Sequence, residues 1–473
     1  MSSSSFTVVP EPALVNTSST IILRGTTEFD QVTYDTKKEM LVMASLKAPL
    51  FEQSAEDRRA PIDICCCIDR SGSMSGPKFD LAKKALVFVL DHLDAKDTMS
   101  VVVYGTFVET VLEFTRMTTE GKAKAQDVIS SLAIDGGTDL CGGLLAALDL
   151  AYQRTSPNEV CSVLLLTDGL ATDGITSPSA ITAEAEKKLS LFGNSTPSVF
   201  TFGFGRDHSE DMLRAISEAG RGMYYYIPTA EEIPVSFADC LGGLQSVVAQ
   251  TMFLTVEGGQ GVRVLKSLST KYRVEGGEVG TREGRVKLGD LYSDEERDLV
   301  FLVEVPGLDE PNDDFVCATF TLTFLNVLTT KEEELTAAAR LPRPQFAPPE
   351  IKVNQAVDIQ KNRLLSAAAM KLSREKASKG DMSGAREVIR SSIECMEKSP
   401  SATSPYCSEL IRGLNDCQKD LKDREHFTVT GSKAMSFKMD SYSAQRSTSS
   451  TLTSPTILYD TPRKKSSRYS SAQ

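Results

Sequence analysis

The sequence predicts an α/β protein in which a mainly parallel, doubly wound sheet is framed by a β-sandwich and followed by helices. Three observations predict this architecture. Short apolar runs alternate with stretches of helical period over residues 59–245, which is typical of a parallel sheet covered by helices. Turn-rich β segments flank this region on both sides. Helical periods then take over after a proline-rich break at 341–349.

The predicted strands of the parallel sheet are short and almost continuously apolar, because strands with both faces buried lack the polar alternation of a surface strand. We expect them at 62–68, 99–104, 161–166, 199–204 and 223–227. Cys65, Cys66 and Cys67 are consecutive in the first strand, where alternating side chains cannot all reach disulfide partners. We therefore interpret them as thiols of the core.

Amphipathic stretches between these strands predict the covering helices. We expect helices at 77–93, 120–132, 140–154, 178–191 and 210–219. The first begins with Pro77, a residue favoured in the first turn of a helix because its missing N–H would be unpaired there anyway.

The β segments on either side of the α/β domain, 16–58 and 246–342, consist of short strands separated by turns with Gly, Asp and Pro. Neither segment is long enough to form a comfortable sandwich alone. We therefore expect both to build one sandwich, with the α/β domain of residues 59–245 inserted into it, as termini lying close together would permit.

Residues 350–424 have apolar residues at helical spacing and predict a three-helix bundle. Two interpretations of this unit stay open, a packed capping bundle and a groove that binds a partner. Residues 1–15 are expected to be disordered.

The tail, residues 427–473, has a different composition from the rest of the chain. It holds seven basic and two acidic side chains, and 19 of its 47 residues are Ser or Thr. So few large apolar side chains cannot offset the entropy of ordering the chain, and we expect a disordered tail. Ser454-Pro and Thr461-Pro resemble sites of proline-directed kinases, so a kinase is a candidate partner of the tail.

Composition excludes several classes of function. The 473 residues carry a net charge of −12, the wrong sign for a general nucleic-acid binder. Only three histidines occur and no Cys-x-x-Cys pair, which excludes zinc fingers and RING domains. No Gly-x-Ser-x-Gly elbow or phosphate-binding loop appears, so we expect no enzyme activity. Neither a transmembrane run nor a secretory signal is visible, and we expect a cytoplasmic protein.

Oxygen-bearing side chains follow two of the predicted strands and open one of the predicted helices. Asp69, Ser71 and Ser73 come directly after the strand at 62–68, Thr138 precedes a helix, and Asp168 ends the strand at 161–166. Ligands of such folds bind at the carboxyl edge of the strands, so these five oxygens can meet there. Hard oxygen donors suit Mg²⁺ or Mn²⁺.

These motifs, Asp69-x-Ser-Gly-Ser73, Gly-Gly-Thr138-Asp139 and Leu-Leu-Thr-Asp168-Gly, resemble the metal-ion-dependent adhesion site of von Willebrand factor type A (vWA) domains. The resemblance covers about 180 residues, in the family's order, and implies a Rossmann-like fold. It further implies that Ser71, Ser73 and Thr138 coordinate the metal through hydroxyls, while Asp69 and Asp168 act largely through bound water. The sixth position would accept an Asp or Glu side chain from a partner protein.

Simpler interpretations exist for single residues. Ser71 and Ser73 could cap the following helix, and Asp139 is better explained as a helix cap than as a ligand. The segment 287–298, with the strand and helices after it, also resembles intracellular vWA proteins of plants and protists, some of which carry a RING and act as ubiquitin ligases.

Three functions are therefore considered. The first is a metal-dependent protein-interaction module. The second is a substrate-binding adaptor in ubiquitin ligation whose RING is supplied by a partner. The third, weakest hypothesis is a metal-dependent hydrolase.

Overall fold

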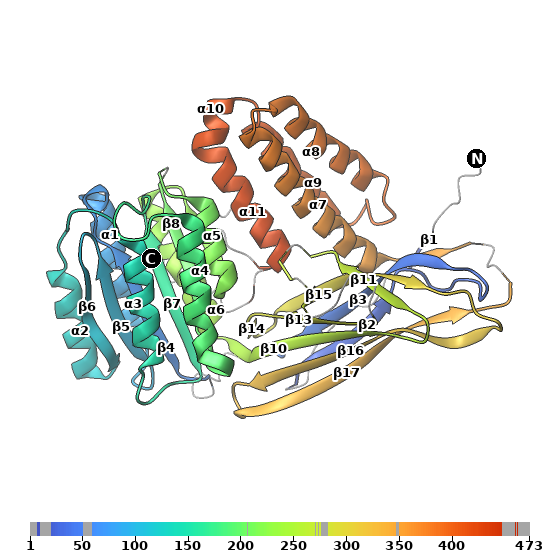
Figure 1. The fold of residues 1–473 in the computed structure, drawn as a ribbon, viewed down its shortest axis with the longest axis horizontal. Helices are drawn as coiled ribbons and strands as arrows, with labels where there is room; N and C mark the ends of the chain where they lie inside the picture. Colours follow the sequence, from blue (N-terminus) through green and yellow to red (C-terminus); the bar gives the residue numbers. More distant parts are fainter. Residues whose placement is uncertain are drawn as a thin grey trace.

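The computed structural model describes residues 7–9, 20–50, 59–205, 207–269, 271–272, 274–275, 282–346, 350–446, 459 and 461. These residues form three parts (Figure 1): an α/β domain, an elongated sandwich, and a group of helices packed where the other two meet. The α/β domain and the sandwich lie side by side, and helix α11 (Ser432–Ala444) faces the α/β domain.

The α/β domain is built on a six-stranded sheet of order β6-β5-β4-β7-β8-β9. All neighbouring pairs are parallel except β5 with β6, which confirms the predicted α/β class. The strands are β4 (Ile62–Asp69), β5 (Thr98–Tyr104), β6 (Val108–Arg116), β7 (Val160–Thr167), β8 (Ser198–Phe204) and β9 (Arg221–Ile227). Every residue of β4 is buried, and its three cysteines are free thiols of the core, as expected.

Helices cover both faces of this sheet. They are α1 (Pro77–Asp91), α2 (Thr119–Ser131), α3 (Leu140–Tyr152), α4 (Pro178–Leu189), α5 (Glu210–Ala219) and α6 (Ile233–Leu244). Side chains of α1, α2 and α6 share one apolar cluster, and those of α3, α4 and α5 share another on the opposite face. The sequence predicted five of these helices but not α6, because nearly all of its residues are buried and no polar face marks its period.

Strand β6 was also missing from the prediction. It lies at the antiparallel edge of the sheet, and Leu112 is its one buried residue. A strand that buries so little has no continuous apolar run to identify it.

The sandwich confirms the predicted insertion. Its first sheet has the order β11-β15-β3-β2, and its second has the order β12-β13-β10-β16-β17, with β14 beside β10. Only β2 (Ile22–Thr27) and β3 (Lys38–Lys47) precede the α/β domain, and β3 pairs with β15 (Glu296–Val305) along its whole length. The others are β10 (Val247–Gly258), β11 (Arg263–Ser267), β12 (Val274–Glu275), β13 (Glu283–Lys287), β14 (Leu291–Tyr292), β16 (Asn312–Asn326) and β17 (Lys331–Arg343).

The N-terminal prediction of disorder over 1–15 is wrong for three residues. Thr7–Val9 forms strand β1, which pairs in parallel with β18 (Lys352–Asn354). An edge strand of three residues depends on backbone pairing with a distant segment, so its own sequence carries no signal.

The three helices predicted within residues 350–424 are present, and a fourth long helix from the predicted tail, α11, joins them. After β18 come α7 (Gln355–Ser378), α8 (Met382–Glu397), α9 (Pro405–Asp420), the short α10 (Arg424–His426), the π-helical η5 (Phe427–Gly431) and α11. The predicted disordered tail of 427–473 is therefore wrong for residues 427–446. Met435, Met439 and Tyr442 of α11 belong to the bundle's apolar core.

Helix α11 is also held by charge. Lys433 Nζ lies 3.9 Å from Glu210 of the α/β domain, Lys438 Nζ lies 3.6 Å from Asp416 of α9, and Arg446 Nε lies 2.9 Å from Glu295 of the sandwich. Three of the seven basic residues that suggested a solvated tail thus pair with acids of the body, and the other four lie outside the described residues. Of the two predicted kinase sites, Ser454 lies outside the described residues, and Thr461 is buried.

Asp440 on α11 makes the stability of the protein depend on pH. Burial raises the pKa of its carboxyl to about 7, although Arg214, Lys271 and Arg374 attract the charged form. The folded state therefore favours the protonated carboxyl. The stabilisation that the protonated Asp440 carboxyl provides is complete below the pKa that this group has in the unfolded chain, near 4. It is lost as the pH rises through 7.

We expect Asp440→Asn, which mimics the protonated form, to raise the free energy of unfolding at pH 8 by about 2–4 kcal/mol. The difference from the wild type should vanish near pH 4. Denaturant unfolding across this pH range would measure it. Asp416→Asn is the control and should lower the free energy of unfolding instead of raising it. Burial raises the pKa of Asp416, but its partners Lys419 and Lys438 outweigh burial and lower this pKa. Equal stability of Asp440→Asn and wild type at pH 8 would contradict the prediction.

Candidate metal-binding site

Strand β4 delivers Asp69 to the carboxyl edge of the sheet, and the short 3₁₀ turn Gly72–Met74 follows. Asp69 Oδ1 accepts a hydrogen bond from the backbone N–H of Ser71 (2.8 Å), and its Oδ2 accepts one from the Thr167 hydroxyl (2.7 Å). The Ser71 and Ser73 hydroxyl oxygens lie 3.1 Å apart. The loop after β4 therefore holds three oxygen-bearing side chains in one small region.

Asp168 joins this group from the neighbouring strand. Because β7 pairs in parallel with β4, the two strands end at the same edge of the sheet. Asp168 Oδ1 accepts a hydrogen bond from Ser73 Oγ at 2.7 Å, and its Oδ2 lies 2.5 Å from Lys78 Nζ. The structure thus brings Asp69, Ser71, Ser73 and Asp168 into one hydrogen-bonded cluster.

Thr138 lies in the loop beside the cluster. This loop is tied to the loop after β4 by a bond from Gly72 N to Gly136 O, at 2.9 Å. The backbone N–H of Thr138 donates to the Thr172 hydroxyl at 2.9 Å. Within the part of the chain that the structure describes, the Thr138 hydroxyl makes no hydrogen bond to the other four candidates, so its role as a ligand stays a prediction.

The helix-capping interpretations now separate. Helix α1 has Gly76 as its N-cap, and neither Ser71 nor Ser73 caps it through a side chain. Asp139 does cap α3, because its Oδ1 accepts a hydrogen bond from Gly142 N at 2.9 Å. The two serine hydroxyls therefore bond within the candidate site and do not cap α1, whereas Asp139 caps its helix.

Burial raises the pKa of the Asp69 carboxyl to about 6, and hydrogen bonds from Ser71 and Thr167 offset only part of this effect. The described residues contain no cluster of three or more His, Cys, Asp or Glu side chains that could hold a metal. The candidate site instead combines two carboxylates with three hydroxyls. Both kinds of group offer hard oxygen donors, the carboxylates charged and the hydroxyls neutral. The residues present therefore fit Mg²⁺ or Mn²⁺.

Lys78 was not identified from the sequence as part of the site. Its ammonium contacts Asp168 and lies 3.3 Å from the carbonyl oxygen of Ser73 and 5.6 Å from the centroid of the Phe204 ring. Its position in the first turn of α1, directly after Pro77, is the signal that could have found it. Lys78 supplies one positive charge next to the Asp168 carboxylate.

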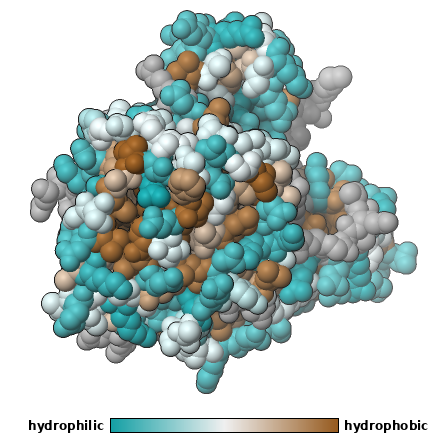
Figure 2. All heavy atoms as spheres, turned by 60° about the vertical axis from the view of Figure 1, so that its left-hand side comes forward, coloured by the Kyte–Doolittle hydropathy of each residue, from teal (hydrophilic) through white to brown (hydrophobic). Residues whose placement is uncertain are grey.

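Exposed apolar side chains surround the candidate site. They come from the loops that carry its residues or are bonded to them, and they are Phe107, Ile134, Leu170 and Ile175, of which Phe107 is 71% exposed. Hydrogen bonds join the loops that carry these side chains. Gly137 N donates to the Thr106 hydroxyl (2.8 Å), and Thr172 N donates to the carbonyl oxygen of Thr138 (3.0 Å). Figure 2 shows apolar side chains among hydrophilic ones on the side of the molecule that the α/β domain occupies.

A mainly parallel sheet with helices on both faces defines a domain of the doubly wound class, and its candidate site lies at the carboxyl edge of the strands. Residues 63–239 match the family model described as the von Willebrand factor type A domain, and this part of the chain is a vWA domain. Residues 353–453 match a second family model, described as the N-terminal region of the CPSF6-like RSLD domain.

Known proteins resemble larger parts of the chain. E3 ubiquitin-protein ligase WAV3 of Arabidopsis thaliana is 32% identical over 256 residues, which are 53% of this chain and 32% of that protein. E3 ubiquitin-protein ligase WAVH1 of the same plant is 23% identical over 407 residues, or 83% of this chain and 53% of that protein. The chain thus spans about a third to a half of these relatives.

A solved structure, a von Willebrand factor type A protein from Catenulispora acidiphila, shares the fold with a TM-score of 0.65. It is 16% identical and covers 89% of this chain and 99% of its own. Among the described residues, no helix combines the length and the apolar character needed to cross a membrane.

Proposed function

We propose that the protein is a metal-dependent protein-interaction module that binds an acidic side chain of a partner through Mg²⁺ or Mn²⁺. Asp69, Ser71, Ser73, Thr138 and Asp168 would hold the metal. When bound, the cation supplies positive charge for a carboxylate, because only two protein carboxylates compensate it.

The observation that carries this proposal is the hydrogen-bonded cluster of Asp69, Ser71, Ser73 and Asp168 at the carboxyl edge of β4 and β7. Around it lie exposed apolar residues such as Phe107 and Leu170. Apolar surface next to a charged anchor is what a protein partner needs, since apolar contacts supply affinity and the charge supplies specificity.

The test is a calorimetric titration of Mg²⁺ and Mn²⁺ into chelator-stripped protein. We expect saturable binding to the wild type and binding at least ~10-fold weaker to the Ser71→Ala, Ser73→Ala double variant, which loses two donors without burying a charge. Ser75→Ala is the matched control, because Ser75 is an exposed serine of the same loop. Wild-type affinity in the double variant would refute the proposed ligands.

Carboxylate binding is tested separately, with Mn²⁺ as the metal and acetate as the probe. We expect acetate to change the electron paramagnetic resonance signal of protein-bound Mn²⁺, because a carboxylate oxygen would replace a coordinated water. A signal that responds to chloride and acetate alike would leave metal binding intact but contradict carboxylate recognition.

A second candidate function is favoured by the relatives. Two proteins named as ubiquitin ligases match this chain, one of them along 83% of its length. We infer that the chain could serve as the substrate-binding part of a ubiquitin ligase whose catalytic RING lies elsewhere. The sequence has no Cys-x-x-Cys pair, and the described residues contain no cluster of three or more His, Cys, Asp or Glu side chains that could hold a metal, so a RING is expected from a partner.

Affinity purification of the protein from its own cells tests the adaptor function. We expect a RING-containing protein among the stable partners, and ubiquitin transfer by the purified complex to a protein bound at the vWA domain. Transfer that continues unchanged with the Ser71→Ala, Ser73→Ala variant would separate this function from the metal site.

A further inference from the structure

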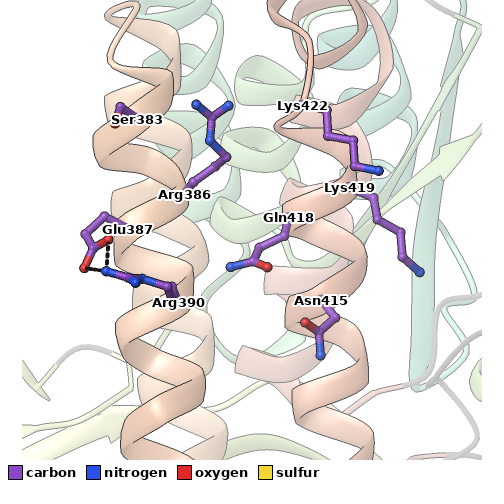
Figure 3. Close-up of a pocket in the computed structure, with 8 residues that line it drawn as sticks. All are labelled: Ser383, Arg386, Glu387, Arg390, Asn415, Gln418, Lys419 and Lys422. Atoms are coloured by element: carbon purple, nitrogen blue, oxygen red, sulfur yellow. Dashed lines mark hydrogen bonds and ion pairs between the residues drawn. The ribbon is translucent and has the colours of Figure 1, made fainter.

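Two basic hollows of the protein differ in how their charges are paired. The larger, about 650 Å³, lies between α8 and α9 and contains Arg386, Arg390, Lys419 and Lys422 (Figure 3). Three of these cations already have partners. Arg390 Nη2 lies 2.6 Å from Glu387, Lys419 Nζ lies 2.9 Å from Asp416, and Arg386 donates to the carbonyl of Leu421 at 2.9 Å. Lys419 also points away from α8.

The smaller hollow, which we call the junction cavity, lies where the vWA domain, the sandwich and the end of α11 meet. Its lining includes five cations, Arg221 from the vWA domain, Lys271, Lys287 and Arg297 from the sandwich, and Arg446 after α11. Glu218 is its one lining acid among the described residues, and Arg214 already pairs with Glu218 at 2.8 Å. Five basic side chains and one acidic side chain among the described residues therefore line the junction cavity.

Two of these cations are buried and share a single counter-ion. Glu295 lies 2.6 Å from Arg297 Nη2 and 2.9 Å from Arg446 Nε, and all three side chains are almost fully buried. Two guanidinium groups against one carboxylate leave one positive charge in excess. A buried charge without a counter-charge is costly, so a further anion in the junction cavity would be stabilising.

The hydrogen bonds of the lining point to the same conclusion. Arg297 is 1% exposed, and its Nε is a buried donor without a hydrogen-bond partner among the described residues. Lys271 Nζ donates to the carbonyl oxygen of Gly222 (3.0 Å) and to the sulfur of Met223 (3.3 Å), and its charge also attracts the buried Asp440. Arg221, also in the lining, has a backbone φ of 57°, in the left-handed region that non-glycine residues rarely adopt.

The size of the junction cavity limits what could balance this charge. Its volume is about 60 Å³, enough for a few water molecules or for one small oxyanion, but not for a nucleotide or a sugar polyphosphate. We propose that the junction cavity binds one tetrahedral oxyanion of the phosphate class, and that this anion ties the vWA domain, the sandwich and α11 together.

Phosphate could reach the cavity as the free ion or as the phosphate group of a modified side chain. Binding in either form stabilises the folded chain by mass action, because the three parts that build the cavity separate on unfolding. The proposal does not depend on the metal site, which uses other residues.

The experiment is thermal unfolding of the full chain in rising inorganic phosphate, with sodium chloride added to keep the ionic strength constant. We expect the Tm to rise by several °C and to saturate, and calorimetry to give one site per chain. The variant is Lys271→Met, Lys287→Met, with circular dichroism to confirm folding. Lys419→Met, Lys422→Met in the hollow between α8 and α9 is the matched control.

Phosphate should stabilise the wild type and the control equally. In the junction variant, the phosphate concentration that gives half of the Tm shift should be at least ~10-fold higher. A Tm that rises linearly without saturation, or equally in all three proteins, would show only the general salting effect of phosphate and would overturn the proposal. O-phosphoserine is the second probe. Saturation by phosphate alone assigns the free ion, and saturation by both extends the site to a phosphorylated side chain.

Discussion

Replacing Glu295 with Gln is expected to lower the free energy of unfolding by about 3 kcal/mol, the largest loss of stability that we predict for a single substitution. Burial disfavours the charged form of Glu295, but Arg297 and Arg446 outweigh burial and hold the pKa of its carboxyl at about 2. The neutral amide would leave two buried guanidinium groups without their counter-ion. Because the group joins the sandwich to the segment after α11, the loss should also loosen α11.

The pH dependence of this contribution follows from the lowered pKa. The stability supplied by Glu295 is complete above its unfolded pKa, near 4.5, and is lost as the pH falls toward 2. Denaturant unfolding at pH 7 and pH 3 should therefore show a large difference between wild type and Glu295→Gln at pH 7 and a smaller one at pH 3.

Glu304→Gln is the matched control for this substitution. Glu304 also lies between two cations, 2.5 Å from Arg263 and 3.1 Å from Lys37, but those cations are 54% and 64% exposed. Solvent screens such pairs, so the control should lose much less stability than Glu295→Gln. Similar losses in the two variants would mean that burial does not strengthen the Glu295 group.

The sequence predicted the vWA sheet and much of the site because both follow from local patterns. Continuous apolar runs identify buried parallel strands, and Asp69 and Asp168 directly follow two of them. Because β4 and β7 are neighbours, the side chains that follow the two strands meet, as the hydrogen bond from Ser73 to Asp168 shows. Lys78 escaped the prediction because its position in the first turn of α1 is only a weak signal, and the point that its long side chain reaches depends on the fold.

The fold of residues 427–446 could not be predicted, for a different physical reason. Composition tests whether a segment can bury enough of its own apolar surface to fold. Helix α11 instead completes surfaces made by other parts of the chain. Its few large side chains, such as Met439 and Tyr442, enter the core of the bundle, and Arg446 reaches a carboxylate of the sandwich. A low apolar content therefore indicated disorder where the structure has an inserted helix.

Ending the chain after Gly431 should consequently have the second large effect. This truncation removes Met435, Met439 and Tyr442 from the bundle core, each worth about 1.5–3 kcal/mol when fully buried. We expect a loss of roughly 5 kcal/mol or more, seen as a Tm lower by more than ~5 °C and as binding of a dye specific for exposed apolar surface.

A chain ending after Arg446 is the control for this truncation, because it keeps α11 and the pair between Arg446 and Glu295. It loses the hydrogen bond between Tyr459 and Tyr406, at 2.7 Å, and should unfold close to the full chain. The two truncations thus distinguish an inserted helix from a solvated tail. If α11 contributed nothing, both truncated chains would unfold at the temperature of the full chain. The Gly431 truncation would then bind no more dye, since no apolar surface of α7 or α9 would have been uncovered.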